Sequence, residues 1–282
     1  MCGGEAQDLI KSAKYAVRAA IEHMPASIRR VYHHYYHNWR FLEQDYQRAT
    51  AEVEGYFRNF VSNCAPPMKG RTELLSALLQ IGITEGLYII DTLHRSLGVE
   101  GDVAEFGVAQ GATSALIANE IRNNGKVFWL YDSFMGLPEP SDKDVLIHDV
   151  ASLGSIKKYK GMIAHPAEAV RNRLAEITFP EKQLRIVPGW VEDLSRTGDL
   201  PEKVCFAYVD LDLYVPIKTV LELLDRRLSP GASVVIDDYG YFSAGAQLAV
   251  DEFVADHRQA YDLQLPVQLC QDQDRFVIMR KL

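Results

Sequence analysis

No apolar run in this sequence approaches the roughly 20 residues that a helix needs to span a bilayer. The N-terminus also lacks the basic stretch, apolar stretch and cleavage site of a secretory signal. Cysteine is scarce: Cys2, Cys64, Cys205 and Cys270 lie far apart, with neither metal-ligand spacing nor the density of a disulfide framework. We therefore expect a soluble, cytoplasmic protein with reduced thiols and no membrane partner.

A dense basic surface is absent as well. The chain has 30 Lys and Arg against 38 Asp and Glu, a formal net charge of −8, and its basic residues are scattered. Nucleic acid is therefore a poor partner, because binding it depends on clustered positive charge. With 282 residues, 48% of them hydrophobic, the chain is long enough to bury one good core and a smaller appendage. A small-molecule substrate fits this composition better.

The chain divides into a helical beginning and a longer α/β part. Helical patterning runs from Ala6 to about Phe60, and the turn signal at Pro66-Pro67 ends it. We predict a helical extension over residues 1–65, serving as a lid or a subunit contact, and a catalytic domain over 66–282. The Tyr- and His-rich segment 31–39 fits packing or a contact in a homo-oligomer better than a metal or stacking site, because its histidines have no chelate spacing.

From Gly101 onward, apolar runs alternate with helical patterns, which predicts a mostly parallel sheet with helices on both faces. A helix from Thr72 to about Leu97 precedes it. The expected strands are 103–108, 127–131, 184–187, 204–211 and 233–236, with a closing antiparallel pair at 266–270 and 275–279. The expected helices are 113–123, 166–177, 216–228 and 246–257. The stretch between Ser133 and His165 is longer than a connector needs, so we predict an active-site lid there.

The segment from Val103 to Ser114 lacks the third glycine of a dinucleotide fingerprint, having only Gly107 and Gly111 with Ala109 between them. Glu105 would also repel a pyrophosphate, which disfavours an NAD-dependent enzyme. An acid at this place can instead attract the cationic amino-acid portion of S-adenosylmethionine, directly or through water. A plain structural turn with a helix cap is the alternative.

The next expected strand ends in Asp132, placed to accept hydrogen bonds from both ribose hydroxyls of such a cofactor. Trp190, after the third strand, can line the adenine pocket or be ordinary core. The candidate cofactor residues are Glu105, Gly107, Ala109, Gly111, Ser114, Asp132, Ser133 and Trp190.

Two further strands each end in a pair of acids: Asp210 with Asp212, and Asp237 with Asp238. Residues two apart on a strand face the same side, so Asp210 and Asp212 can both point into the crevice. Four carboxylates without His or Cys suit Mg²⁺, with manganese or calcium as alternatives. One of them, Asp212 or its rival Asp210, is free to remove a proton from a substrate hydroxyl. Helix capping and a plain strand end are the structural alternatives.

Four motifs in the same order resemble the macrocin O-methyltransferase family, over roughly residues 66–260. They are Glu105-Phe106-Gly107-Val108 with Gly111, Asp132-Ser133-Phe134 before Gly136-Leu137-Pro138, Asp210-Leu211-Asp212-Leu213-Tyr214, and Pro230-Gly231 leading to Ile236-Asp237-Asp238-Tyr239. Departures from the family pattern occur at Gln110, Ala112, Val215-Pro216-Ile217 and Ala232, while the acids are retained.

The resemblance implies a class I S-adenosylmethionine-dependent methyltransferase fold, with Mg²⁺ held by Asp210, Asp237 and Asp238. It also implies methylation of a sugar hydroxyl, commonly on the deoxysugar of an antibiotic. A catechol would suit the same metal chelate, so a catechol-type O-methyltransferase stays open. A non-catalytic S-adenosylmethionine- or nucleotide-binding module is the remaining alternative. His148 and His165, in the predicted lid, have no assigned role.

Overall fold

A sheet of five parallel strands with an antiparallel edge carries the fold. The structure, a computed structural model, describes residues 46–78, 81–266 and 275–282, and Thr50–Leu282 forms a compact unit. The strand order is β3-β2-β1-β4-β5-β7-β6. The strands are β1 (Asp102–Phe106), β2 (Phe128–Asp132), β3 (Leu184–Pro188), β4 (Val204–Val209), β5 (Leu228–Ile236), β6 (Tyr261–Gln264) and β7 (Val277–Lys281).

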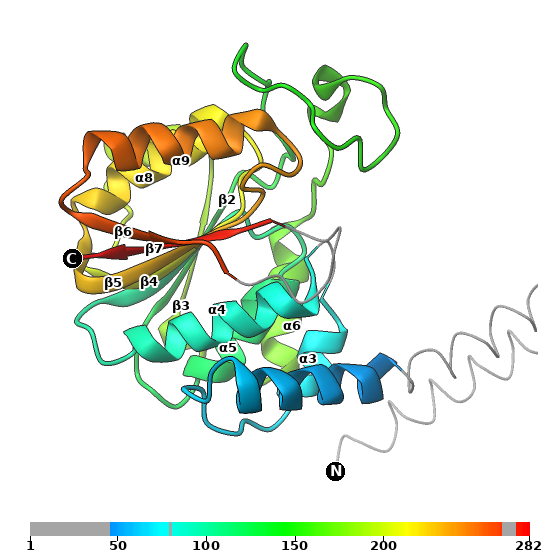
Figure 1. Ribbon diagram of the computed structural model, residues 1–282, viewed down its shortest axis with the longest axis vertical. Helices are drawn as coiled ribbons and strands as arrows, with labels where there is room; N and C mark the ends of the chain where they lie inside the picture. The colour runs from blue at the N-terminus through cyan, green and yellow to red at the C-terminus, as the bar shows by residue number, and fades with distance from the viewer. Residues whose placement is uncertain (1–45, 79–80, 267–274) are drawn as a thin grey trace, which may run out of the picture. The chain divides into compact units, whose positions relative to one another are not determined.

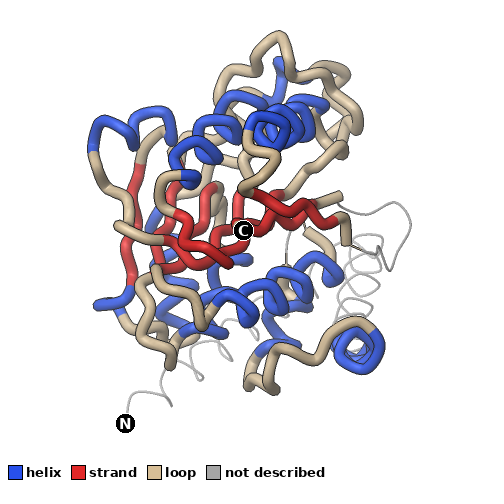
Figure 2. Tube along the Cα trace, turned by 60° about the vertical axis from the view of Figure 1, so that its left-hand side comes forward, coloured by secondary structure: helices blue, strands red, loops and turns tan. Residues whose placement is uncertain are grey.

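Helices cover both faces of the sheet in two layers, as Figure 1 and Figure 2 show. One layer contains α8 and α9, and the other contains α3 to α6. The helices are α3 (Arg71–Ser76), α4 (Ile83–Ser96), α5 (Ala112–Ile121), α6 (Ala167–Glu176), α7 (Leu194–Thr197), α8 (Tyr214–Asp225) and α9 (Ala244–Asp256), with 3₁₀ turns η1 (Ile156–Tyr159), η2 (Glu181–Gln183) and η3 (Val191–Asp193). Among the residues described, no helix is both long enough and apolar enough to cross a membrane.

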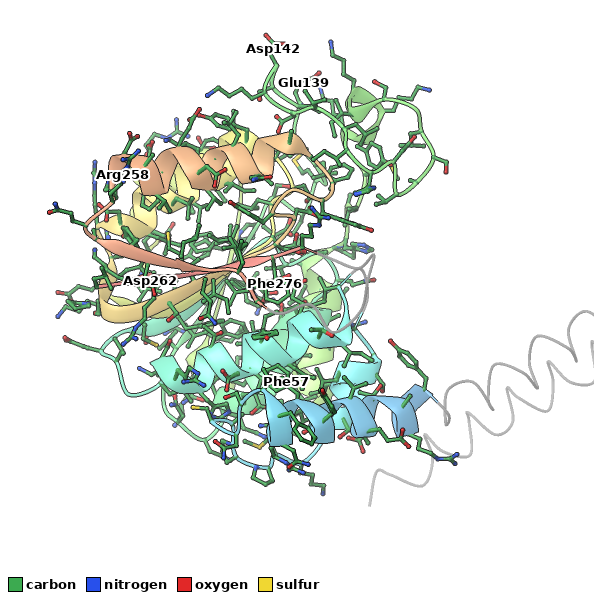
Figure 3. All side chains as sticks on the ribbon, in the orientation of Figure 1. Phe57, Glu139, Asp142, Arg258, Asp262 and Phe276 are labelled. Carbon is green, nitrogen blue, oxygen red and sulfur yellow. The ribbon has the colours of Figure 1, made fainter. Side chains whose placement is uncertain are left out.

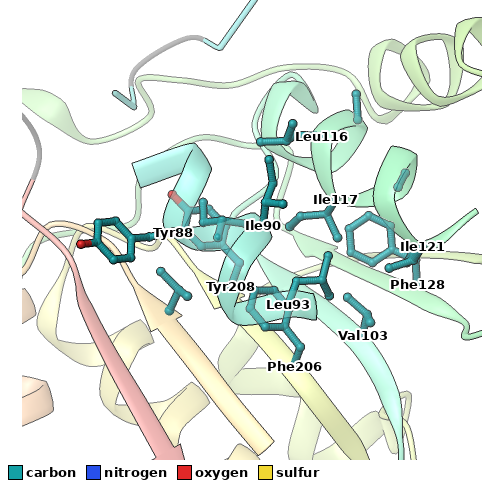
Figure 4. Close-up of a cluster of buried hydrophobic side chains, with 14 of the residues drawn as sticks. Tyr88, Ile90, Leu93, Val103, Leu116, Ile117, Ile121, Phe128, Phe206 and Tyr208 are labelled. Carbon is teal, nitrogen blue, oxygen red and sulfur yellow. The ribbon is translucent and has the colours of Figure 1, made fainter. Parts of the chain in front are cut away.

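The central strand β4 explains why the sheet lies between two helix layers. All six of its residues are buried. Phe206 and Tyr208 pack in the cluster under α4 and α5 (Figure 4), whereas Ala207 and Val209 pack in the cluster under α8 and α9. A strand that is apolar on both faces is stable only when helices cover both, which is typical of parallel sheets.

The predicted order of strands and helices is confirmed, including the antiparallel edge, with shifts at several ends. β5 begins at Leu228, five residues before its predicted start, and α8 begins at Tyr214 because a proline at its third position is tolerated in a first helical turn. The closing strand is Tyr261–Gln264 and ends before Pro266, which has no N–H for the ladder. Residues 267–270 of the predicted strand lie outside the described residues.

The prediction of one helix from Thr72 to Leu97 was wrong. The chain leaves the helical conformation at Ala77, and Gly82 is extended before α4 begins. This break lets α3 fold back onto α4, where a methyl group at Gly86 would lie 2.8 Å from Leu75 and 2.7 Å from Leu78. Apolar residues continue on both sides of the turn and concealed it, because hydrophobic periodicity alone does not mark it.

The helical residues 50–60 pack against this layer of the domain. Phe57, labelled in Figure 3, is buried. Its ring meets the Tyr88 ring edge-on, with 4.9 Å between ring centroids. The predicted boundary between the helical extension and the catalytic domain at residue 65 stays a prediction. Residues 1–45, which include the His-rich segment 31–39, lie outside the described residues.

A buried charge cluster joins α3, α4 and α5. The Arg71 guanidinium donates to both Glu120 carboxylate oxygens at 2.9 and 2.6 Å, and His94 Nε2 lies 2.8 Å from the same carboxylate. Burial by itself raises the pKa of Glu120, but the hydrogen bonds from Arg71 and His94 hold that pKa below its ordinary value. The ionised carboxylate is therefore stable only while its partners remain.

We expect Arg71→Met to lower the free energy of unfolding by about 3 kcal/mol, because it leaves the buried Glu120 charge without its main partner. Urea unfolding followed by circular dichroism measures the change. Arg196→Met is the matched control: Arg196 is exposed and its ion pair with Asp193 lies at the surface, so the substitution should change stability by about 0–1 kcal/mol. Equal effects of the two variants would contradict the account.

Candidate functional site

A cavity of about 430 Å³ opens at the carboxyl ends of β1, β2, β4 and β5. Open parallel sheets bind their ligands at this edge. The strand ends contribute Gly107, Asp132, Asp210 and the pair Asp237 and Asp238, and the predicted lid contributes a second wall. Every charged side chain among the described residues that line the cavity is an aspartate.

The first acidic pair lies in a tight turn rather than on the strand. β4 ends at Val209, not at the predicted Leu211. The Asp210 amide still donates a hydrogen bond to the carbonyl of Phe106 on β1, at 2.8 Å. Asp212 then adopts a left-handed conformation with φ 60° before α8 begins. The prediction that a strand aligns Asp210 and Asp212 was therefore wrong in its geometry, although the turn does bring the two side chains together.

The second acidic pair follows β5. Asp238 is also left-handed, with φ 57°, and its amide donates to Asp237 Oδ1 at 2.7 Å. Carboxylate oxygens of Asp210, Asp212 and Asp238 all lie within 4.8 Å of one another. Asp237 lines the same cavity beside this cluster, with its Oδ2 3.5 Å from the Tyr208 hydroxyl.

Burial and mutual repulsion disfavour charge on the cluster. Burial raises the pKa of Asp210 and Asp238 well above the ordinary aspartate range, and the neighbouring carboxylates raise it further. Burial also raises the pKa of Asp212 to about 6, although a hydrogen bond with the Asp238 side chain partly opposes this. A divalent cation would reverse these effects, because it stabilises the ionised forms of all three.

The donor set fits a hard cation such as Mg²⁺. Several convergent carboxylate oxygens, without His or Cys, are what Mg²⁺ prefers, and an open cavity leaves room for water or substrate oxygens. The sequence-based set was Asp210, Asp237 and Asp238, whereas the three side chains that converge are Asp210, Asp212 and Asp238. The ligand set remains a proposal.

The turn after β1 forms the other part of the cavity. A methyl group at Gly107 would lie 1.6 Å from the Asp210 carbonyl oxygen, so only glycine allows the ends of β1 and β4 to approach this closely. Ala109 is left-handed, with φ 47°, and its amide and that of Val108 both donate to Asp132 Oδ2 at 2.8 Å. Asp132 therefore fixes the shape of the turn besides lining the cavity.

The predicted cofactor residues separate into two groups. The residues lining the cavity are Gly107, Ala109, Asp132, Ser133 and Trp190. Glu105, Gly111 and Ser114 do not line it. Glu105 is buried on β1, Ser114 is buried on α5, and Gly111 precedes α5 in a left-handed conformation. Their predicted contacts with a cofactor stay predictions.

The surroundings of Glu105 disfavour its charged form. Burial raises its pKa to about 8, the Ser114 hydroxyl partly opposes this, and the Asp132 carboxylate adds to it. One carboxyl oxygen, Oε2, has no hydrogen-bond partner among the described residues. A neutral carboxyl would attract a ligand ammonium group less than the carboxylate assumed from the sequence.

The stretch from Ser133 to His165, which we call the lid, packs on the domain through a small apolar cluster. Leu137 and Tyr159 from the lid pack with Leu213 and Phe242 from the domain. Its chain also pairs with the start of α9: the Ile147 amide donates to the Phe242 carbonyl, and the Ala244 amide to the Val145 carbonyl, both at 2.9 Å. In Figures 1 and 3 the lid extends beyond α9, with Glu139 and Asp142 towards its outer end.

The lid supplies site residues that sequence reasoning missed. Val150, Tyr159 and Ile163 line the cavity together with Tyr241 and Phe242 from the β5–α9 connection. Nothing local in the sequence distinguishes them from packing residues. His148 is exposed and lies over the Tyr241 ring, with 4.7 Å between ring centroids. Neither His148 nor His165 lines the cavity.

Several known proteins that this chain is similar to are O-methyltransferases. The family described as macrocin-O-methyltransferase (TylF) matches residues 88–273. A Streptomyces olivaceus protein, 8-demethyl-8-(2,3-dimethoxy-alpha-L-rhamnosyl)-tetracenomycin-C 4'-O-methyltransferase, is 32% identical over 183 residues, which is 64% of this chain and 66% of that protein. The mycinamicin III 3''-O-methyltransferase of Micromonospora griseorubida is 32% identical over 149 residues, 50% of this chain and 56% of that protein. The match thus spans less than two thirds of either relative.

A solved structure extends the likeness to the fold. The O-methyltransferase NovP superposes with a TM-score of 0.59 at 24% identity, over 71% of this chain and 80% of that one. The fold is that of class I S-adenosylmethionine-dependent methyltransferases, as predicted, and the predicted family resemblance is confirmed.

We expect Glu105→Gln to change how stability depends on pH. The folded pKa of about 8 lies above the ordinary 4.5, so the folded protein holds a proton between these values that the unfolded chain has released. Stability from this group is therefore lost as pH rises from 4.5 to 8, by up to about 1.4 kcal/mol per pH unit. Urea unfolding across this range, in EDTA, should show the variant gaining stability relative to wild type as pH rises.

The other groups facing Glu105 are Ser114 on α5, Asp132 on β2, and Tyr208 and Asp210 from the β4 side. These groups are present in both the wild type and the Glu105→Gln variant. The difference between their two stability profiles therefore reports the contribution of Glu105. Parallel pH profiles for wild type and variant would show that Glu105 is ionised throughout.

Proposed function

The chain belongs to the macrocin O-methyltransferase family, and on that premise we propose that it transfers the methyl group of S-adenosylmethionine to a hydroxyl group of a sugar. The observation that carries the proposal is the convergence of Asp210, Asp212 and Asp238 in the cavity that also contains the Gly107 turn. A carboxylate cluster beside a cofactor-sized cavity suits a reaction in which a hydroxyl must be oriented and must lose a proton.

Asp210 and Asp238 would hold a Mg²⁺ ion, with Asp237 beside them as a third carboxylate. When bound, the ion supplies positive charge that offsets the carboxylate repulsion and lowers the pKa of an acceptor hydroxyl. Asp212 is then left to take the hydroxyl proton. Its carboxylate oxygen lies within 4.8 Å of the oxygens of Asp210 and Asp238, which supports this role because a hydroxyl group held at the ion would be within its reach.

S-adenosylmethionine, when bound, supplies an already activated methyl group, and its transfer forms one O–C bond, breaks one C–S bond and releases one proton. The Gly107 turn, Asp132 and Trp190 would hold this cofactor. Asp132 has two backbone amides on Oδ2 and the Phe134 amide on Oδ1 at 2.6 Å, so the carboxylate is already oriented before a ribose is bound. The chain's contribution is mainly orientation and proton removal.

The acceptor sugar is one already attached to a neutral, apolar aglycone. The curated relatives support this, since their names give a rhamnosyl-tetracenomycin and mycinamicin III as the molecules they methylate. The cavity supports it too, because its lid wall presents Val150, Ile163 and Tyr159 to an apolar group.

We expect Asp212→Asn to reduce kcat by about 10²- to 10⁴-fold, because the amide cannot accept the hydroxyl proton. Methyl transfer from labelled S-adenosylmethionine to a panel of glycosides measures it, with Mg²⁺ present or removed by EDTA. Calorimetric binding of S-adenosylhomocysteine should be unchanged, and the exposed Asp256→Asn serves as control. Wild-type kcat in Asp212→Asn would exclude this residue as the base, and absence of turnover with every glycoside would contradict the function.

Acceptor class is tested with two substitutions of equally exposed valines on the lid. Val150 lines the cavity and Val145 does not, although both are 61% exposed. The wild type should methylate a neutral glycoside and not the corresponding nucleotide-linked sugar. Val150→Lys should improve use of the nucleotide-linked sugar, since it adds a positive charge at the mouth, and Val145→Lys should not. Preference of the wild type for the nucleotide-linked sugar would contradict the assignment.

A further inference from the structure

Asp144, on the lid, lies at the junction of three segments that are far apart in sequence. Its side chain is buried. Oδ1 accepts from the Tyr214 amide at 2.8 Å and from the Ser243 hydroxyl at 3.2 Å, while Oδ2 accepts from the Ser141 amide at 2.8 Å and the Ser141 hydroxyl at 2.7 Å. The four donors, two amides and two hydroxyls, engage both oxygens of the carboxylate.

Two of these donors mark the starts of the helices that follow the acidic turns. Tyr214 is the first residue of α8 and comes two residues after Asp212. Ser243 caps α9, where its hydroxyl accepts from the Gly245 amide at 3.0 Å, and it comes five residues after Asp238. Asp144 thus bonds to the chain just beyond each of the two left-handed aspartates.

Its position also fits a negative charge. The N-termini of α8 and α9, helices of 12 and 13 residues, both point positive ends at this carboxylate. The approach to α9 is close: a methyl group at Gly245 would lie 1.9 Å from Asp144 Oδ1. The absence of a side chain at Gly245 therefore leaves the space that the Asp144 carboxylate occupies.

Left-handed backbone is unfavourable for aspartate relative to glycine and persists only where surrounding contacts impose it. The turn at Asp212 leads into α8 and the turn at Asp238 leads towards α9. The Asp144 carboxylate bonds to the start of both helices. We propose that Asp144 is a positioning residue that holds the Asp212 and Asp238 carboxylates in register with each other, and so couples the lid to the proposed chemistry. This inference rests on the proposed function for its kinetic readout.

Asp144→Asn tests it, because an amide offers one accepting oxygen and would point its NH₂ group at other donors. We expect Mg²⁺ affinity, measured by calorimetry in the presence of S-adenosylhomocysteine, and kcat each to fall by about 10- to 100-fold, the usual effect of losing a residue that orients metal ligands. The acceptor KM and the affinity for S-adenosylhomocysteine should stay at wild-type values, since the Gly107 turn does not depend on Asp144.

Glu252→Gln is the matched control. Glu252 also joins the lid to the helix layer, through Lys143 at 3.0 Å and the Tyr214 hydroxyl at 2.5 Å. It is partly exposed, and its contact with Tyr214 is to the side chain, whereas Asp144 accepts from the Tyr214 backbone amide. This variant should keep wild-type Mg²⁺ affinity and kcat.

Wild-type Mg²⁺ affinity and kcat in a folded Asp144→Asn would overturn the proposal. So would a parallel loss of S-adenosylhomocysteine affinity, which would indicate general structural damage. If Asp144→Asn does not fold, Ser141→Ala takes its place, because it removes only one of the four bonds and should weaken both quantities in the same direction. Should the wild type methylate no acceptor, the proposed function fails, whereas the Mg²⁺ titrations still decide the role of Asp144.

Discussion

Repulsion among clustered carboxylates is the constraint on which the rest of this site depends. Asp210, Asp212 and Asp238 converge within 4.8 Å in surroundings that raise the pKa of each. Such an arrangement is unfavourable unless a proton or a cation is shared among them. The fold concentrates them nonetheless, because adjacent parallel strands end at the same edge and each strand passes its acids into the turn before a helix.

The two parts of the cavity place their carboxylates in different electrostatic surroundings. At the Gly107 turn, Asp132 accepts hydrogen bonds from three backbone amides, so the chain itself holds both carboxylate oxygens. At the acidic turns, the chain supplies few donors and the carboxylates face one another. One side therefore suits a ligand that is recognised by shape and hydrogen bonds, and the other suits a ligand that brings positive charge. The two sides meet at one close contact, that of Gly107 with the end of β4.

Sequence patterns located the strands because residues such as those of β4 are apolar on both faces, and they located the acids because these follow the strands directly. They missed the features that depend on distant partners. Asp144 bonds to residues 70 and 99 positions away, so no local pattern marks it. The pair Asp210 and Asp212 was identified through strand alternation, whereas the structure joins them through a left-handed residue that sequence periodicity does not reveal. The α3–α4 break was hidden for a similar reason, since apolar residues continue through it.

The lid shares a small apolar cluster with the domain, and its attachment includes residues 144–147 and Tyr159. Tyr159 both anchors the lid and lines the cavity, whereas the exposed Val150 on the same inner wall is separate from these anchor points. Substitutions on that inner wall can therefore accumulate without moving the acidic turns. Divergence within such a family can then alter which molecule is accepted while the reaction itself is inherited unchanged.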